Sequence, residues 1–368
     1  MKLFFHSDII ANAVHYHQIH IHFRCSSSRR IQIILATVGR SRNNNTLLYI
    51  LIPLFLCLIL LISTIGTGCS SKKDAIRFGA ADIGGIYYTF ANAYAGLVNN
   101  DAPDYSIEAK KTAGSAANLR LLADGYIDLC IAQNDMIDDA VNGTGTFVGK
   151  SISGYSAIAS LYPEACQIIV KKDSNIKSLD DLTGKTISIG ASDSGTERNA
   201  KQILEVAGLN NDLVKTTNLD YIDAAESLVS GEIDAFFVTA GIQTTVIEEL
   251  TRTCDIRLIG LNDSCKNKLL SAYSYYSDFI IPANTYSGQT EDVSTVCVQA
   301  VMLADNDLSK DTVEDLTRLL FEHANDLQYS LSIDMQLNEQ AATKGITIPF
   351  HKGAAAYYKE KGITVDVR

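Results

Sequence analysis

The chain has 368 residues, of which 46% are hydrophobic and 20% charged, and its formal net charge at pH 7 is −11. This length allows about two folded domains, and the apolar content is sufficient for a large buried core. The acidic balance argues against nucleic-acid binding, because an extended basic surface supplies most of the attraction to phosphate backbones. We therefore expect no nucleic-acid partner.

The first 39 residues contain five of the seven histidines. Histidine-rich tracts can bind metal ions, but HYHQIHIH alternates its histidines instead of spacing them along one helix face. The stretch also precedes an export signal, and such a signal normally begins a chain. We interpret the stretch as an over-extended gene start, and we predict no metal site and no cofactor.

An apolar run over residues 47–66 follows a basic, polar stretch and ends close to Cys69. This order, with small residues before the cysteine, resembles a bacterial lipoprotein signal. We predict that residues 1–69 comprise the extension and the signal, that Cys69 carries lipid, and that residues 70–75 form a tether. The alternative is an uncleaved transmembrane helix, since about 20 apolar residues span a bilayer. Both interpretations place the body outside the cytoplasm, anchored to the cell membrane.

The remaining cysteines have no CxxC spacing, which argues against a zinc or redox motif. Cys130, Cys166 and Cys297 lie in apolar runs and are expected to be buried. Cys254 and Cys265 flank a predicted strand and turn, and a disulfide between them remains open.

From residue 75 onward, short β-branched runs alternate with longer helical patterns, beginning with AIRFGAA and YYTFANAYAGLVNN. Such alternation predicts α/β layers with parallel strands. Ligands of open α/β sheets bind beyond the carboxyl ends of the strands, where helix N-termini attract anions. Four loops at such positions are rich in small residues, which let a ligand approach the backbone. They lie at residues 83–85, 112–115, 192–196 and 239–241.

Five segments in the same order resemble the TAXI-type solute receptors of tripartite ATP-independent periplasmic (TRAP) transporters. They lie at residues 79–88, 111–135, 160–197, 231–241 and 281–296, and IPFHKGAAAYYKEKG at 348–362 adds further agreement. The resemblance implies a two-lobed α/β fold of the type II periplasmic-binding-protein class, with two crossing strands. It predicts lobe one at 76–167 and 299–368, and lobe two at 168–298.

The resemblance also implies a function: a non-enzymatic receptor that captures a small carboxylate or amino acid between its lobes and delivers it to TRAP membrane permease subunits. In lobe one the candidate ligand-binding residues are Asp82, Gly84, Gly85, Tyr87, Ser115, Asn118, Gln133 and Asn134. In lobe two they are Ser192, Ser194, Gly195, Thr196, Thr239 and Gly241. Their hydroxyl, amide and backbone groups suit a carboxylate.

Simpler roles compete with ligand binding at several of these positions. Gly84 and Gly85 suit a tight turn, Asn118 a helix cap and Ser194 an N-cap. Arg198, two residues into its helix, is expected to point into solvent. Asp82 would repel a second carboxylate but pair with an ammonium group, which favours a ligand such as glutamate or glutamine.

Two other classes of function remain as alternatives. A serine hydrolase would use Ser194 as nucleophile, but GASDSGT lacks a GxSxG elbow. The body's two histidines, His323 and His351, lie near the far end of the chain, which disfavours a catalytic triad. A ligand-sensing protein for a membrane signalling partner would use the same two-lobed closure.

Overall fold

The computed structural model describes residues 19–21, 33–35, 74–83, 85–102, 104–333, 335 and 337–367. The chain divides into two compact units, residues 1–72 and 73–368. In the first unit β1 (Ile19–Ile21) pairs antiparallel with β2 (Ile33–Leu35). The predicted export signal and Cys69 lie outside the described residues. Within the described residues, no helix combines the length and hydropathy needed to cross a membrane.

The second unit begins with three parallel strands that form the sheet of lobe one. These strands are β3 (Asp74–Gly79), β4 (Tyr105–Lys110) and β5 (Leu129–Gln133), and β3 lies between the other two. Helices α2 (Ile86–Asp101), α3 (Ser115–Ala123) and α4 (Asn134–Asn142) follow them in turn. This is the predicted strand–loop–helix alternation, with each helix beginning just beyond the carboxyl end of a strand.

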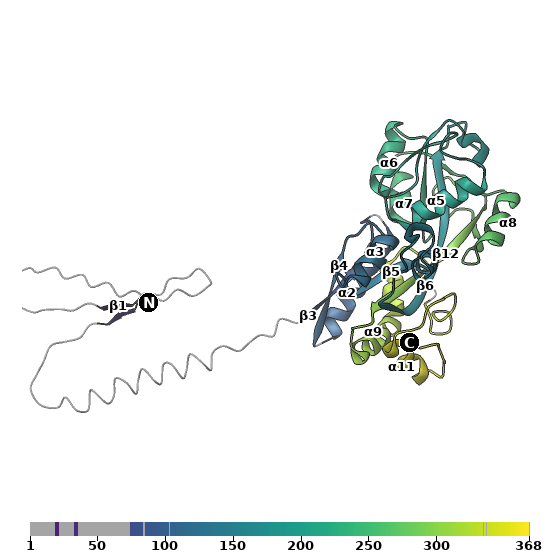
Figure 1. The fold of residues 1–368 in the computed structure, drawn as a ribbon. Coiled ribbons are helices and arrows are strands. Elements are labelled where there is room, and N and C mark those ends of the chain that lie inside the picture. The colour runs from purple at the N-terminus through teal and green to yellow at the C-terminus, as the bar shows by residue number, and fades with distance from the viewer. Residues whose placement is uncertain are drawn as a thin grey trace, which may run out of the picture. The chain divides into compact units, whose positions relative to one another are not determined.

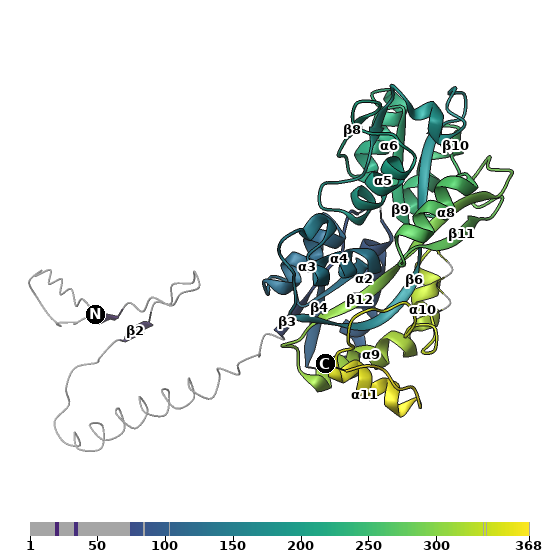
Figure 2. The same cartoon turned by 45° about the vertical axis from the view of Figure 1, so that its right-hand side comes forward.

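Two long antiparallel strands connect the lobes, as Figures 1 and 2 show. They are β6 (Tyr155–Lys171) and β12 (Val293–Asp305). In lobe one β12 pairs with β5, and in lobe two β6 pairs with β9. The order β4-β3-β5-β12-β6 in lobe one places the returning strand between the third and fourth strands of the body. The predicted type II fold with two crossing strands is confirmed.

Lobe two continues the same sheet with parallel strands β7 (Thr186–Ser188), β8 (Lys215–Thr217) and β9 (Ala235–Ala240). Two further strands, β10 (Ile256–Leu258) and β11 (Ser277–Ile281), pair antiparallel with β6 and β12. The helices of this lobe are α5 (Gly195–Val206), α6 (Tyr221–Ser230), α7 (Thr245–Leu250) and α8 (Asp263–Ala272). Short 3-10 turns lie at Gly145–Phe147 in lobe one and Leu179–Leu182 in lobe two.

After β12 the chain returns to lobe one and adds α9 (Lys310–Glu322), α10 (Ala324–Ser330) and α11 (Lys352–Glu360). One hydrophobic core unites these helices with residues 76–162. Two further cores, drawn from residues 165–298, pack on the two faces of the lobe-two part of this sheet. Separate cores make each lobe a rigid body, and the crossing strands are the places where the lobes can bend.

The described cysteines are all free. Cys130, Cys166 and Cys297 are buried, as predicted. Cys265 is buried as well, and Cys254 is partly buried, so the disulfide that the sequence left open is not formed.

Candidate functional site

A small cavity lies where loops of lobe one meet loops of lobe two. Its volume is about 40 Å³, room for roughly three water molecules. The residues from lobe one are Ala81, Asp82, Gly85, Ile86, Tyr87, Ala113, Gly114, Ser115, Gln133 and Glu164. Those from lobe two are Ala191, Ser194, Gly195, Thr196, Tyr221, Thr239 and Ala240. We call this space the interlobe cavity.

Three helices begin at the interlobe cavity. Their N-cap residues, Gly85 for α2, Gly114 for α3 and Ser194 for α5, all line it. The first N–H groups of a helix have no partner within the helix, and the helix dipole makes this end positive. The Ser194 hydroxyl accepts a hydrogen bond from the Glu197 N–H at 3.0 Å, which is the predicted N-cap. The cavity wall therefore favours an anionic group at the helix starts.

Two carboxyl groups also line the cavity. Glu164 is 1% exposed, and its Oε2 accepts a hydrogen bond from the Tyr87 hydroxyl at 2.8 Å. Burial raises the pKa of Glu164 to about 8. Asp82 is 9% exposed, and burial raises its pKa to about 6, assisted by the negative charge of Asp220. The lining thus combines positive helix ends with acidic side chains, an arrangement that suits a ligand carrying both charges.

The wall from lobe two is a network of hydroxyl groups. The Thr196 hydroxyl lies 2.7 Å from the Tyr221 hydroxyl, which in turn donates to the Thr239 carbonyl at 3.0 Å. Thr196 also accepts from the Thr239 N–H at 3.2 Å. These bonds fix the start of α5 against the end of β9.

Close approach of the two lobes depends on glycine at two positions. A Cβ atom at Gly195 would overlap the Gln133 side chain of lobe one. Gly114 has φ of +110°, and a Cβ there would lie 3.3 Å from Ser194. The Ala116 N–H donates to the Asp193 carbonyl across the same contact at 3.1 Å. Backbone therefore meets backbone at this edge of the cavity.

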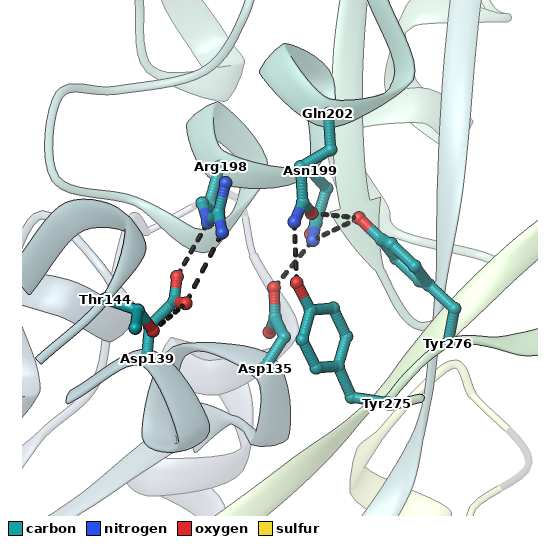
Figure 3. A network of polar contacts seen from close by, with 8 residues as sticks. All are labelled: Asp135, Asp139, Thr144, Arg198, Asn199, Gln202, Tyr275 and Tyr276. Atoms are coloured by element: carbon teal, nitrogen blue, oxygen red, sulfur yellow. Dashed lines mark hydrogen bonds and ion pairs between the residues drawn. The ribbon is translucent and has the colours of Figure 1, made fainter. Parts of the chain in front are cut away.

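Beside the cavity, helices α4 and α5 are joined by a polar network, shown in Figure 3. Arg198 Nε lies 2.7 Å from Asp139 Oδ2, and the Asn199 amide donates to Asp135 at 2.8 Å. Tyr276 donates to Gln202 at 2.7 Å and accepts from Asn199 at 2.9 Å. The expectation that Arg198 points into solvent is wrong, because α4 of the other lobe places a buried carboxylate opposite it.

The structure brings together nine of the candidate ligand-binding residues at the interlobe cavity. They are Asp82, Gly85, Tyr87, Ser115, Gln133, Ser194, Gly195, Thr196 and Thr239. Gly84 lies outside the described residues. The remaining four do not line the cavity: they are Asn118, Asn134, Ser192 and Gly241.

Those four candidates have other positions. Asn118 is fully buried and donates to the carbonyls of Ala80 at 2.6 Å and Ile131 at 2.9 Å, which ties α3 to the sheet. The Asn134 side chain accepts from the Gln299 N–H at 3.0 Å. Ser192 is exposed, and a Cβ at Gly241 would meet Ile333.

The most informative residue of the cavity, Glu164, was missed by the sequence analysis, as was Tyr221. A signal for Glu164 existed, because an acidic residue inside a long apolar strand is rarely buried without a role. For Tyr221 the sequence offers little, since a tyrosine at a helix start is common in packed cores. Its part in the wall depends on contacts with two residues distant in the chain.

Comparison with known proteins places the chain in a family. Residues 78–362 match the NMT1-like family. The chain belongs to this family. The match begins in β3 and ends just after α11, so it includes both lobes of this NMT1-like protein and every residue of the interlobe cavity.

Several solved structures are similar to this NMT1-like chain. The periplasmic aliphatic sulphonate binding protein SsuA of Escherichia coli is 16% identical, with 80% of this chain and 91% of that one covered and a TM-score of 0.43. A putative L-cystine ABC transporter protein of Listeria monocytogenes is 15% identical, with 70% and 94% covered and a TM-score of 0.42. A probable amino-acid ABC transporter extracellular-binding protein of Bacillus subtilis, ytmK, is 14% identical, with 70% and 96% covered and a TM-score of 0.42.

Proposed function

We propose that this protein is an extracytoplasmic solute-binding receptor that captures a small carboxylate or amino acid, of glutamate or glutamine type, between its two lobes. The observation that carries the proposal is the interlobe cavity, whose lining comes from both lobes and is completed only when they meet. Helix N-termini supply N–H groups for a carboxylate. In this proposal Asp82, which lines the cavity, supplies a negative charge for an amine.

Binding between lobes gives the receptor a shape that reports occupancy. Contacts from both lobes to one ligand stabilise the closed arrangement over the open one. The cavity has room for roughly three water molecules, so a ligand of amino-acid size enters only when the lobes separate. We propose that the closed form is recognised by TRAP permease subunits, and that a lipid on Cys69 keeps the receptor at the outer face of the membrane. The resemblance of the sequence motifs to TAXI receptors supports this partner.

A serine hydrolase fits the site less well. The Ser194 hydroxyl is engaged as the N-cap of α5, and no histidine lines the cavity among the described residues. His351 caps α11, and His323 lies 2.8 Å from Asp101 and 3.2 Å from Asp326. A fluorophosphonate probe is therefore expected to leave Ser194 unlabelled. Covalent labelling of Ser194 would instead support the serine hydrolase.

The experiment that tests the proposal starts with the full-length protein purified from its own membrane. Mass spectrometry of denatured protein identifies any small molecule that co-purifies, and calorimetry measures binding of L-glutamate and L-glutamine. Binding of an amino acid or small carboxylate supports a receptor; no binding to any such compound contradicts it. Reconstitution with candidate permeases then distinguishes a TRAP partner from an ABC transporter or a signalling protein.

A further inference from the structure

Glu164 occupies an unusual position for a carboxyl group. It lies on the crossing strand β6, is 1% exposed, and lines the interlobe cavity. Its neighbours there are the Tyr87 hydroxyl, which donates to it at 2.8 Å, and the Gln133 side chain. No Lys, Arg or His occurs among the described residues that line the cavity. Burying a carboxyl group without a cationic partner costs free energy. A buried strand is therefore expected to contain such a group only where another interaction offsets this cost.

A second observation points to a missing hydrogen-bond donor. Gln133 is 3% exposed and lines the cavity, and its Oε1 atom is buried without a hydrogen-bond partner. Buried amide oxygens are nearly always paired, and an orphan of this kind marks the place of an absent group. Gln133 and Glu164 both belong to the first-lobe side of the cavity. The unpaired Gln133 Oε1 can only accept a hydrogen bond, so its missing partner is a donor.

Lys111 pairs with the other carboxyl group of the cavity, that of Asp82. Lys111 is half exposed, and its Nζ lies 3.8 Å from Asp82 Oδ1 and 3.7 Å from Asp220 Oδ2. It therefore connects a carboxylate of lobe one with a carboxylate of lobe two. Asp82 is therefore already partly compensated by a lysine. The hydrogen-bond partners of Glu164 are a hydroxyl and an amide, which leaves its carboxyl group without a cationic partner.

We propose that Glu164 selects for a positively charged amine, with Gln133 Oε1 accepting one of its N–H groups, so that the solute is an amino acid or similar small ammonium compound. The inference rests on the proposed receptor function and names its substrate class. The carboxylate of such a zwitterion meets the starts of α2, α3 and α5. A dicarboxylate of the same length leaves Glu164 and Gln133 unsatisfied and is bound weakly.

The charge on Glu164 changes when the amine binds. Burial raises the pKa of Glu164 to about 8 in the empty site, so near pH 7 the group mostly holds its proton. An incoming ammonium group stabilises the ionised form and lowers this pKa. Binding therefore releases a proton near neutral pH, and affinity rises as the pH approaches 8. The titratable groups that interact with Glu164 are Tyr162 and Cys166 on its own strand β6, and Tyr87, Asp135, Tyr221 and Cys297 on elements packed against it.

The test is calorimetry on the full-length protein with three probes: L-glutamate, L-glutamine and glutarate, which lacks the amine. Wild type is expected to bind at least one amino acid more tightly than glutarate. Glu164→Gln keeps the size of the side chain but removes its charge, and is expected to weaken amino-acid binding at least about 30-fold, with little effect on glutarate. Buffers of different ionisation enthalpy are expected to reveal proton release for wild type and none for Glu164→Gln.

Two variants keep the result interpretable. Tyr87→Phe removes a donor to Glu164 but leaves the carboxyl, so preference for the amine persists. Glu164→Asp keeps the carboxyl group and is expected to retain part of the affinity for amino acids. It replaces Glu164→Gln if circular dichroism shows that Glu164→Gln is unfolded. In that case, partial affinity together with proton release on binding supports the inference.

Three results would overturn the inference. Unchanged amino-acid affinity in Glu164→Gln refutes it and leaves the receptor function intact. Proton uptake on binding, with glutarate preferred, shows instead that a protonated Glu164 donates to a ligand carboxylate. If wild type binds none of the three probes, the proposed function fails together with the inference.

Discussion

Arg198 of lobe two and Asp139 of lobe one form an ion pair between α5 and α4, with Nε and Oδ2 2.7 Å apart. The Asp139 side chain is 5% exposed and that of Arg198 is 19% exposed. Asp139 also accepts from the Thr144 hydroxyl at 2.9 Å, which holds the carboxylate in place. The pair is thus much less exposed to solvent than an ordinary surface salt bridge. It exists only while the lobes are in contact.

Removing Arg198 is expected to favour separated lobes. Arg198→Gln leaves the Asp139 carboxylate buried without its partner, which we expect to cost the closed form about 1–2 kcal/mol. Ligand affinity then falls about 5–30-fold. Calorimetry measures the affinity, and small-angle X-ray scattering detects the larger radius of gyration. Arg120→Gln is the matched control: its pair with Asp193 also joins the lobes, but both partners are more than one-third exposed, and it is expected to change affinity little.

Gly195 is expected to tolerate no side chain while the lobes are closed. Gly195→Ala places a methyl group against the Gln133 amide and is expected to weaken ligand binding at least about tenfold. Combining it with Gln133→Ala removes the clash, so the two losses should not add. Gly96→Ala serves as control, because a Cβ there meets nothing within 4 Å. Strict additivity of the two changes in calorimetry would contradict a clash at this contact.

Asp82 is expected to discriminate between ligands with and without an amine. Its pKa of about 6 leaves it mostly ionised at pH 7. Asp82→Ala should therefore weaken binding of L-glutamate or L-glutamine more than that of glutarate, by about tenfold in relative affinity. Calorimetry at pH 7 gives the three dissociation constants. Equal affinity of wild type for glutarate and glutamate would count against this role.

Asp135 is expected to make stability depend on pH in the neutral range. Burial raises its pKa to about 7, despite a hydrogen bond from Asn199. Between about pH 4 and 7 the folded protein binds more protons at this site than the unfolded chain does, so the free energy of unfolding falls as pH rises. Asp135→Asn removes this site's contribution, worth up to about 4 kcal/mol by pH 8. Guanidinium unfolding of both proteins from pH 4 to pH 8 measures the difference.

A control carboxyl responds in the opposite direction. Asp181 is exposed, and hydrogen bonds from the Lys177 N–H and the Ser178 residue lower its pKa. Its contribution is present above its ordinary pKa and lost only as the solution becomes acidic. Asp181→Asn should therefore leave the slope between pH 5 and pH 8 unchanged. If the difference in unfolding free energy between wild type and Asp135→Asn does not change from pH 4 to pH 8, Asp135 does not titrate in this range.

Cys69 is expected to carry the membrane anchor. Growth of an expressing bacterium with labelled palmitate should label the full-length protein, and Cys69→Ser should abolish the label and prevent cleavage of the N-terminal residues. An uncleaved transmembrane helix predicts another outcome: no lipid label, and an intact N-terminus in both proteins. Mass spectrometry of the membrane fraction distinguishes the two.

Much of the fold follows from local sequence. The alternation of β-branched runs with helical patterns predicts the strands, the helices and the loops between them, because these depend on neighbours a few residues away. The small residues at 112–115 and 192–196 mark two of the helix starts that meet in the cavity. Ser194 illustrates the point, since its role as an N-cap depends only on Glu197, three residues along.

Contacts between distant segments were decided by the tertiary structure alone. Glu164 and Tyr87 are 77 positions apart in the sequence, and Arg198 and Asp139 are 59 apart. No local pattern specifies such pairs, because each requires two lobes with separate cores to close on one another. The sequence by itself determined the helix starts, the small-residue loops and the acidic charge at Asp82. Only the tertiary structure places Glu164 in a buried position near the unpaired Gln133 amide oxygen, and only it pairs Arg198 with Asp139.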